Sequence, residues 1–127
     1  MKLATHLAIN PRFSGRVTTL DKDVAEVTLP THSDMTADAH GLIHGGFIFS
    51  AADFAAMAAV NDPNVVLGAA EVTFIAPVKK GETVVCRARV VAAKGKKRLV
   101  DVKAYVANRR VFEGRFTAFV LEKHVLE

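Results

Sequence analysis

The sequence has no tryptophan, and only one cysteine and one tyrosine occur among its 127 residues. The lone Cys86 cannot form a disulfide within the chain, which favours a reducing compartment, so we expect a cytoplasmic protein. A surface that stacks nucleic-acid bases interleaves aromatic with basic side chains, whereas the eight phenylalanines lie mostly in apolar segments. We therefore interpret the net charge of +4 as a solvated surface and expect no nucleic-acid partner.

Long apolar runs are also missing. The longest, Phe47 to Val60, is interrupted by Ser50 and Asp53 and is shorter than the ~20 residues that a membrane-spanning helix needs. The first residues hold no apolar run of the length found in signal peptides. No repeat, low-complexity tract or linker divides the chain, so we expect a single domain over residues 1–127 and no membrane partner.

Hydrophobic periodicity predicts an α+β fold. Residues 16–29 alternate around a turn at 21–23, as in a hairpin or a bent strand, and residues 30–40 predict a polar loop. Residues 45–61 predict a helix that ends before Asp62-Pro63, because the residue preceding a proline disfavours the helical region. Its apolar residues occupy the whole circumference, so we expect a helix that is buried on all sides.

Strand patterns follow the predicted helix. The expected strands are residues 65–75, 83–90, 100–106 and 112–118, and the expected turns are 78–81, 94–97 and 108–110. This succession predicts an antiparallel meander, and hence a curved sheet wrapped around one long central helix.

Two adjacent glycines, Gly45 and Gly46, stand where the predicted helix begins, although glycine costs about 1 kcal/mol relative to alanine in a helix. The first N–H groups of a helix have no internal partner and carry the positive end of its dipole. Without side chains in the way, these groups could form an oxyanion hole for a ligand carbonyl. The alternative is that the glycines only permit a tight turn or close packing.

Asp53 is the only charged residue between His44 and Asp62. It lies in the third turn of the predicted helix, too far from the helix start to act as a cap. Burying a carboxylate is costly unless the group is paired, hydrogen-bonded or protonated. Asp53 is therefore a candidate general base or nucleophile with a raised pKa, and the alternative is an aspartate on a solvated stripe of a half-exposed helix.

The segment from Asp38 to Phe47 reads Asp-Ala-His-Gly-Leu-Ile-His-Gly-Gly-Phe, and Asp53 follows His44 by nine residues. This pattern resembles the signature of hotdog-fold acyl-CoA thioesterases of the phenylacetate-pathway and 4-hydroxybenzoyl-CoA thioesterase type, in which Asn-x-x-Gly-x-x-His-Gly-Gly precedes an aspartate at the same spacing. Residues 74–82 resemble the Phe-x-x-Pro-x-x-x-Gly element of that family. The likeness extends from about Val17 to Phe119.

The resemblance implies a homodimer or a homotetramer with active sites at the dimer interface. His44 and the amides of Gly45 and Gly46 in one subunit would bind the carbonyl of an acyl-CoA or another acyl thioester. Asp53 of the partner subunit would activate water or attack directly, giving a carboxylic acid and free coenzyme A. We expect no cofactor.

Four more positions are expected to contact the substrate. Phe47 and Phe54 would line an apolar acyl pocket, and Lys79 and Lys80 would hold coenzyme A phosphates if their turn and the turn at 94–97 flank the entrance. The alternative for these lysines is ordinary charge at hairpin tips.

The chain departs from the family pattern at two positions. Asp38 is also expected at the substrate, but it replaces the family's asparagine, and a carboxylate cannot donate a hydrogen bond. Leu67 stands where a serine or threonine often helps to hold the water.

Three other functions remain as alternatives. The first is a non-catalytic protein that binds acyl-CoA or an acyl carrier, and the second is an acyl-thioester dehydratase, which normally needs a proline-rich loop that this chain lacks. The third is a metal site. Its potential ligands are close in sequence, but they fall in a segment better interpreted as a polar loop; they are His32, Asp34, Asp38, His40 and His44.

Overall fold

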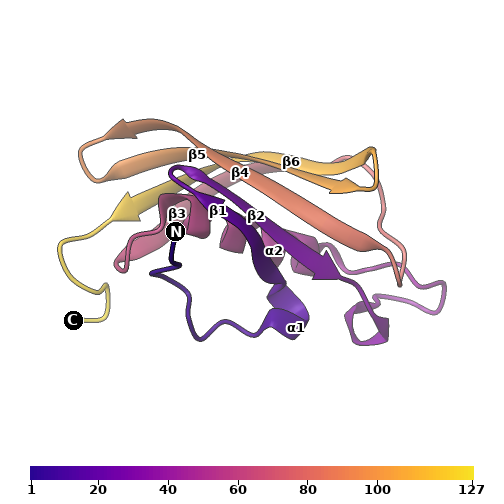
Figure 1. Ribbon diagram of the computed structural model, residues 1–127. Coiled ribbons are helices and arrows are strands. Elements are labelled where there is room, and N and C mark those ends of the chain that lie inside the picture. The colour runs from indigo at the N-terminus through magenta and orange to yellow at the C-terminus, as the bar shows by residue number, and fades with distance from the viewer.

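A six-stranded antiparallel sheet curves around one long helix in the computed structural model, which describes residues 1–127 (Figure 1). The strands are β1 (Arg16–Asp21), β2 (Val24–Pro30), β3 (Val65–Phe74), β4 (Thr83–Lys94), β5 (Lys97–Val106) and β6 (Arg109–Val120). The helices are α1 (Pro11–Ser14), the 3-10 turn η1 (Ser33–Met35) and the central α2 (Gly45–Val60). This arrangement confirms the predicted α+β class and the hotdog architecture.

The central helix α2 begins and ends where the sequence predicts. His44 caps its start, and Asn61 ends it in the left-handed conformation with φ of 53°. The Asn61 N–H donates to the carbonyl of Met57 at 2.8 Å. One cluster of 26 buried apolar residues joins α2 to the inner face of the sheet. Burial of α2 is incomplete, however, since Phe49, Ser50 and Asp53 are only partly covered within one chain.

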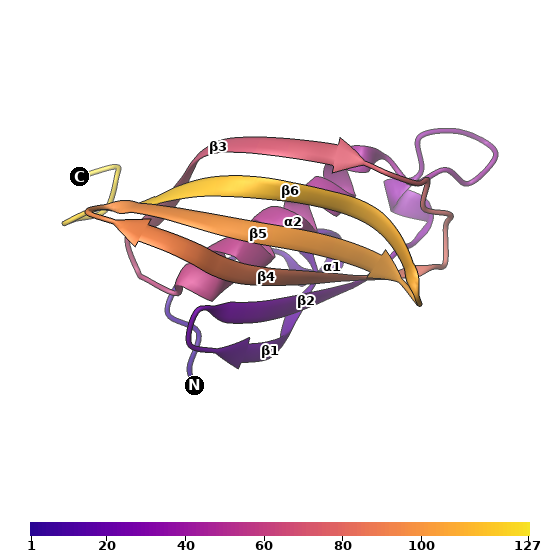
Figure 2. The ribbon, with the colours of Figure 1, turned by 90° about the horizontal axis from the view of Figure 1, so that it is seen from above.

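The order of the strands differs from the predicted meander. Strands β4, β5 and β6 follow one another, but β3 pairs with β6 at the far edge, giving the order β1-β2-β4-β5-β6-β3 (Figure 2). Residues 75–82 therefore carry the chain from the edge strand β3, past β6 and β5, to the interior strand β4, and they pass the segment that precedes α2. Alternating polarity defines which face of a strand is buried, but not which strand lies beside it.

Two local predictions also need correction. The last turn is at Ala107 and Asn108, so Arg109 and Arg110 already belong to β6. The segment predicted as a polar loop holds η1 and the fully buried Met35, whose carbonyl accepts a hydrogen bond from the His44 N–H at 2.9 Å. This contact ties the loop to the start of α2.

The N-terminal segment, residues 1–15, lies across α2 and ends in α1, which the sequence analysis did not predict. A usable signal was present, since Asn10 caps α1 and Pro11 occupies its first position, as is typical of helix starts. Ser14 contacts Ser50 of α2 through their hydroxyl groups at 2.7 Å. None of the helices has the length and apolar character of a candidate membrane span.

Candidate functional site

His44 forms the start of α2 with its own side chain. Its Nδ1 accepts a hydrogen bond from the Gly46 N–H at 2.8 Å. A neutral imidazole that accepts through Nδ1 carries its proton on Nε2. The His44 side chain is exposed, so this Nε2–H is a donor available to a ligand at the helix start.

The two glycines of the motif have different roles. Gly46 uses its N–H for the His44 cap, and a Cβ at this position would lie 2.8 Å from His44 Nδ1. Gly45 has an N–H that makes no hydrogen bond within the chain, and a Cβ there would lie 3.1 Å from the Phe74 ring. Both amides were predicted to be free, but only the Gly45 N–H is, because the Gly46 N–H is bonded to the His44 side chain. Close packing explains the absence of a side chain at both positions.

An apolar pocket of about 280 Å³ lies beside the free amide of Gly45. Three large apolar side chains in its wall are unusually exposed, with Phe74 at 53%, Ile75 at 44% and Leu42 at 41%. An apolar surface next to an unpaired N–H and the positive end of a helix dipole suits an apolar group that bears a polar oxygen. These three residues were not predicted as pocket residues from the sequence, although Phe74 and Ile75 belong to the element that resembles the family.

Asp53 is held in the third turn of α2 with a carboxylate that lacks partners. Its Oδ1 is buried and accepts no hydrogen bond within the chain. Burial raises the pKa of Asp53 to about 6. A carboxylate kept in this state is costly for folding, and such groups cluster at catalytic and binding sites.

Gly45 and Asp53 of one chain are too far apart to meet one carbonyl group. Eight residues separate them along α2, which corresponds to roughly 12 Å at 1.5 Å per residue. The Gly45 N–H also points out of the start of the helix, away from the later turns. A site that uses both groups therefore needs them from two different chains.

Asp38 organises the loop that leads to His44. Its Oδ1 accepts hydrogen bonds from the N–H groups of His40 at 2.9 Å and Leu42 at 3.1 Å. The side chain is exposed and acts as an acceptor, so its role here requires no proton on the carboxylate. The Asp38 carboxylate thus shapes the approach to the helix start.

Lys79 and Lys80 lie beside that same approach. The Lys80 N–H donates to the Gly41 carbonyl at 2.8 Å, and Lys79 forms an isolated β-bridge with Leu42. The second basic turn, residues 94–97, is at the other end of β4, about 40 Å away for a strand of 12 residues. Within a single chain, the two turns therefore do not flank one entrance.

The two phenylalanines predicted to line one pocket face different surroundings. The Phe47 ring contacts His44 at a centroid distance of 6.1 Å and Phe13 of α1 at 5.8 Å. Phe54 stacks on His6 at 6.1 Å and lines a cavity beneath the N-terminal segment. Neither phenylalanine lines the pocket beside Gly45.

The histidines and acidic residues of the 32–44 segment do not converge on a metal site. No group of three or more His, Cys, Asp or Glu side chains is placed to share a metal ion. Asp34 instead pairs with Arg12, and His32 Nε2 lies 3.0 Å from the Arg12 carbonyl.

A known family pattern covers His44, Gly45 and Asp53. A family model described as the thioesterase superfamily matches residues 40–113, which hold the whole of α2 and strands β3 to β5. The chain belongs to the thioesterase superfamily.

Solved structures agree with this membership. The uncharacterized protein PH1136 from Pyrococcus horikoshii is 46% identical with a TM-score of 0.99, over 100% of this chain and 98% of that one. The PaaI protein of the phenylacetic acid degradation operon of E. coli is 25% identical with a TM-score of 0.75, over 81% and 80% of the chains. The predicted resemblance to hotdog-fold thioesterases of the phenylacetate-pathway type is thus confirmed.

Two curated relatives of this chain are named after different activities. A methylthioribose-1-phosphate isomerase of Aquifex aeolicus is 50% identical over 123 residues, which are 96% of this chain and 27% of that protein. The transcription factor FapR of Caldanaerobacter subterraneus is 33% identical over 86 residues, which are 68% of this chain and 43% of that protein. The chain spans less than half the length of both relatives, so their names describe longer proteins.

Proposed function

We propose that the protein hydrolyses an acyl-CoA thioester at a site formed between two copies of the chain. The observation that carries this proposal is Asp53, a partly buried carboxylate with a raised pKa and an unpartnered Oδ1. Membership of the thioesterase superfamily indicates the class of bond. The free amide at the start of α2 supplies the complementary electrophilic group.

Two donors polarise the thioester carbonyl in this proposal. They are the Gly45 N–H, which points out of the start of α2 where the helix dipole is positive, and the Nε2–H of the exposed His44 side chain. Negative charge develops on the carbonyl oxygen as the carbon is attacked, and a fixed donor stabilises it by about 3–4 kcal/mol. The pocket bounded by Leu42, Phe74 and Ile75 would hold the apolar part of the substrate.

Asp53 of the partner subunit is the base or the nucleophile. As a base, its carboxylate takes a proton from water while the water oxygen forms a bond to the carbonyl carbon. The carbon–sulfur bond then breaks, and the leaving thiolate takes up the proton to give free coenzyme A and a carboxylic acid. As a nucleophile, the Asp53 carboxylate would attack the carbonyl carbon, and the carbon–sulfur bond would break to release the coenzyme A thiolate and leave a mixed anhydride. Water would then cleave the anhydride to the carboxylic acid, regenerating the Asp53 carboxylate and supplying the proton that the thiolate takes up.

Lys79 and Lys80 fit a role at the entrance. Their turn contacts the segment that leads into α2, so these two exposed residues lie beside the approach to Gly45. Phosphate groups of coenzyme A are anions that such exposed lysines bind as point charges.

A second candidate is a protein that binds acyl-CoA without cleaving it. The similarity to FapR, which is named a transcription factor and not an enzyme, favours this alternative. Asp38 also favours it, because the family signature has an asparagine there and the Asp38 carboxylate is engaged with loop amides.

One experiment separates the two candidates. Release of free thiol from a panel of acyl-CoAs would be followed with the wild-type protein and with Asp53→Asn, while direct binding of each acyl-CoA is measured in parallel. We expect thiol release that falls at least 100-fold in Asp53→Asn, because the group that activates water is lost. Tight binding without thiol release from any substrate would favour the binding protein, and equal rates in the variant would exclude Asp53 as the base or nucleophile.

A further inference from the structure

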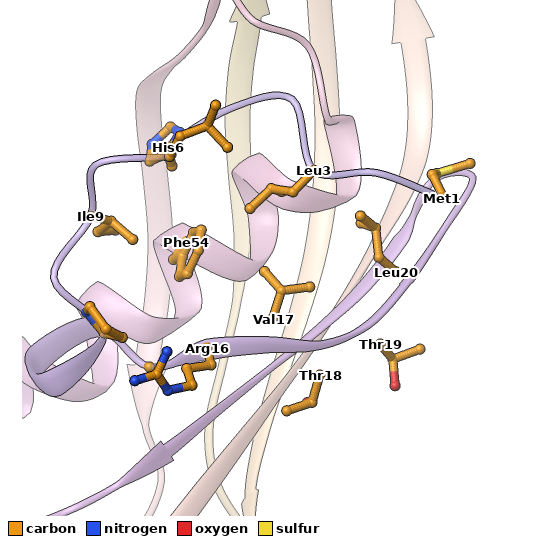
Figure 3. A pocket seen from close by; sticks show the side chains of 13 residues that line it. Met1, Leu3, His6, Ile9, Arg16, Val17, Thr18, Thr19, Leu20 and Phe54 are labelled. Carbon is orange, nitrogen blue, oxygen red and sulfur yellow. The ribbon is translucent and has the colours of Figure 1, made fainter.

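The face of α2 that carries Asp53 is incompletely covered within one chain. The helix packs mainly on β2, β4 and β5, and residues 1–15 cover the side of α2 that carries Phe54 (Figure 3). Between these two covers, Phe49, Asp53 and Val60 stay partly exposed. They share one side of the helix, because spacings of four and seven residues return to the same face. This stripe is the part of α2 that a second copy of the chain can cover.

The proposed site determines where a two-fold axis crosses α2. In a closed dimer the same surface of each chain meets its copy, so Gly45 of either chain faces Asp53 of the other. The axis then passes midway between these two positions along the helix, at Phe49, which is roughly 6 Å from each at 1.5 Å per residue. Each Phe49 therefore faces its own copy.

The free edge of the sheet leads to the same residue. If β3 pairs with its copy about its own centre, the axis passes beside Ala69 and Ala70. Ala70 pairs with Phe116 of β6, and the centroids of the Phe116 and Phe49 rings are 5.5 Å apart. The two positions of the axis, one derived from α2 and one from β3, therefore coincide.

An apolar strip connects this place to the pocket beside Gly45. Phe74, Val72 and Ala70 alternate along the inner face of β3, where each remains at least partly exposed. From Phe74 to Ala70 the strip is roughly 13 Å long. Phe74 lines the pocket beside Gly45, and Phe49 lies at the Ala70 end.

We propose that Phe49 of each chain meets its copy at the two-fold axis, and that the two rings form the wall between two acyl sites. This inference rests on the hydrolysis proposed above, because it takes the pairing of Gly45 with Asp53 from that site. The acyl group of each substrate extends from its carbonyl along the inner face of β3 and ends against the pair of rings. Phe49 thus limits the length of the acyl group, and without it the two sites share one apolar space.

Cysteine cross-linking tests the position of Phe49 without using activity. Directly packed helices lie about 8–10 Å apart, which brings facing Cα atoms close to the separation of about 4.4–6.8 Å found in disulfides. Phe49→Cys should therefore form a covalent dimer on mild oxidation, seen by electrophoresis without reductant. The native Cys86 is buried, so the wild type should stay uncrosslinked.

Ser50→Cys is the matched control for that experiment. Ser50 is also a partly buried residue of α2, but its hydroxyl bonds to Ser14 on the side of the N-terminal segment. No cross-link in Phe49→Cys, or an equal yield in Ser50→Cys, would overturn the proposal.

Binding of butyryl-CoA and decanoyl-CoA tests the wall. Each variant would also carry Asp53→Asn, so that neither ligand is consumed, and calorimetry gives the two dissociation constants. In Phe49→Ala the preference for decanoyl-CoA should rise at least tenfold over the chain with Phe49 intact, which is the effect of burying about two further methylenes. Phe49→Trp keeps an aromatic ring and enlarges the wall, so the preference should move in the opposite direction. Phe13→Ala removes another partly buried phenylalanine, which belongs to α1, and should leave the preference unchanged.

The outcomes separate this inference from the proposed hydrolysis. A cross-link and a change in length preference, without thiol release from any acyl-CoA, would support the wall and exclude hydrolysis. Thiol release by the wild type without a cross-link in Phe49→Cys would support hydrolysis and overturn the wall. An unchanged length preference in Phe49→Ala would overturn the role of the rings whether or not the cross-link forms. If Phe49→Ala does not fold, Phe49→Trp and the cross-link decide.

Discussion

The carboxylate of Asp53 makes the folded chain sensitive to pH. Its pKa is raised from 3.8 to about 6 by burial, so the folded state binds a proton more tightly than the unfolded state. Between pH 3.8 and about 6, the free energy of unfolding falls as the pH rises. Above about pH 6, the full cost of burying the charged carboxylate is present. We expect Asp53→Asn to increase the free energy of unfolding by about 1–3 kcal/mol at pH 8, and by little at pH 4. Denaturant unfolding at the two pH values measures this difference, and an equal effect at both would contradict it.

The same pKa predicts the pH dependence of hydrolysis. Asp53 must be deprotonated to act as a base or a nucleophile, so kcat/KM should rise with pH and level off above about 6. The loss of thioester absorbance would follow the reaction without depending on the protonation of the released thiol. A rate that is constant between pH 5 and pH 8 would mean that another group limits the reaction.

The amide of Gly45 can be tested without disturbing the rest of α2. Gly45→Pro removes the N–H at the first helical position, where proline is well tolerated and where this N–H has no partner within the chain. Gly45→Ala is the control, because it adds a Cβ against the Phe74 ring but keeps the N–H. We expect kcat to fall about 100-fold or more in Gly45→Pro and far less in Gly45→Ala, which steady-state kinetics would measure. Equal losses in both variants would assign the effect to crowding at Phe74.

At the residue scale, the sequence identifies the unusual positions but does not specify the role of each one. Asp53 is conspicuous because it is the only charge within an apolar helix, and its partial burial and raised pKa agree with that expectation. The different roles of Gly45 and Gly46 depend on where the His44 ring lies, which is a side-chain rotamer that the order of residues does not specify. The position of Phe54 beneath the N-terminal segment depends on the unpredicted path of residues 1–15.

At the scale of the elements, the start of the N-terminal segment is held on α2 by the side chain of Asn61. Asn61→Gly keeps a residue suited to the left-handed conformation at φ of 53° and removes both hydrogen bonds to the segment. We expect faster amide exchange in residues 2–9, with global stability lowered by only about 1–2 kcal/mol. Hydrogen exchange followed residue by residue measures the effect.

Asn61→Asp is the matched variant for that experiment. It keeps an acceptor for the Ala4 N–H and loses only the donor to the Lys2 carbonyl, so its exchange rates should lie between those of the wild type and Asn61→Gly. Unchanged exchange in both variants would show that the apolar contacts of Leu3 and Ile9 hold the segment instead.

Element boundaries could be predicted well, whereas the neighbours of each strand could not. The limits of α2 follow from its glycines and from Asp62-Pro63, and the hairpin turn between β1 and β2 follows from its polar residues. The placement of β3 beside β6 requires contacts over about 50 residues of sequence, and no local pattern encodes them. The connection 75–82 is the feature that the meander prediction lacked.

The sheet of a single chain ends at two edges, and the longer one bears on function. β3 has 10 residues and pairs only with β6, whereas the other edge, β1, has six residues. A long free edge is usually covered, and pairing with a second copy is one way to cover it. The separation of Gly45 and Asp53 along α2 leads independently to the same requirement for a second chain.

Mixed assemblies of two inactive variants test that requirement. In a dimer of Gly45→Pro with Asp53→Asn, one site would receive the intact Gly45 and the intact Asp53 from different chains. Random mixing makes half of the dimers mixed, each with one intact site of two, so we expect about a quarter of wild-type activity. The control mixes wild type with the chain that carries both changes. If sites are shared between chains, the mixed dimers of this control should be inactive, and the wild-type dimers should leave about a quarter of the activity. If each chain holds its own site, about half of the activity should remain. Thiol release after joint unfolding and refolding measures both mixtures, and a failure of the first to recover activity would place the site within one chain.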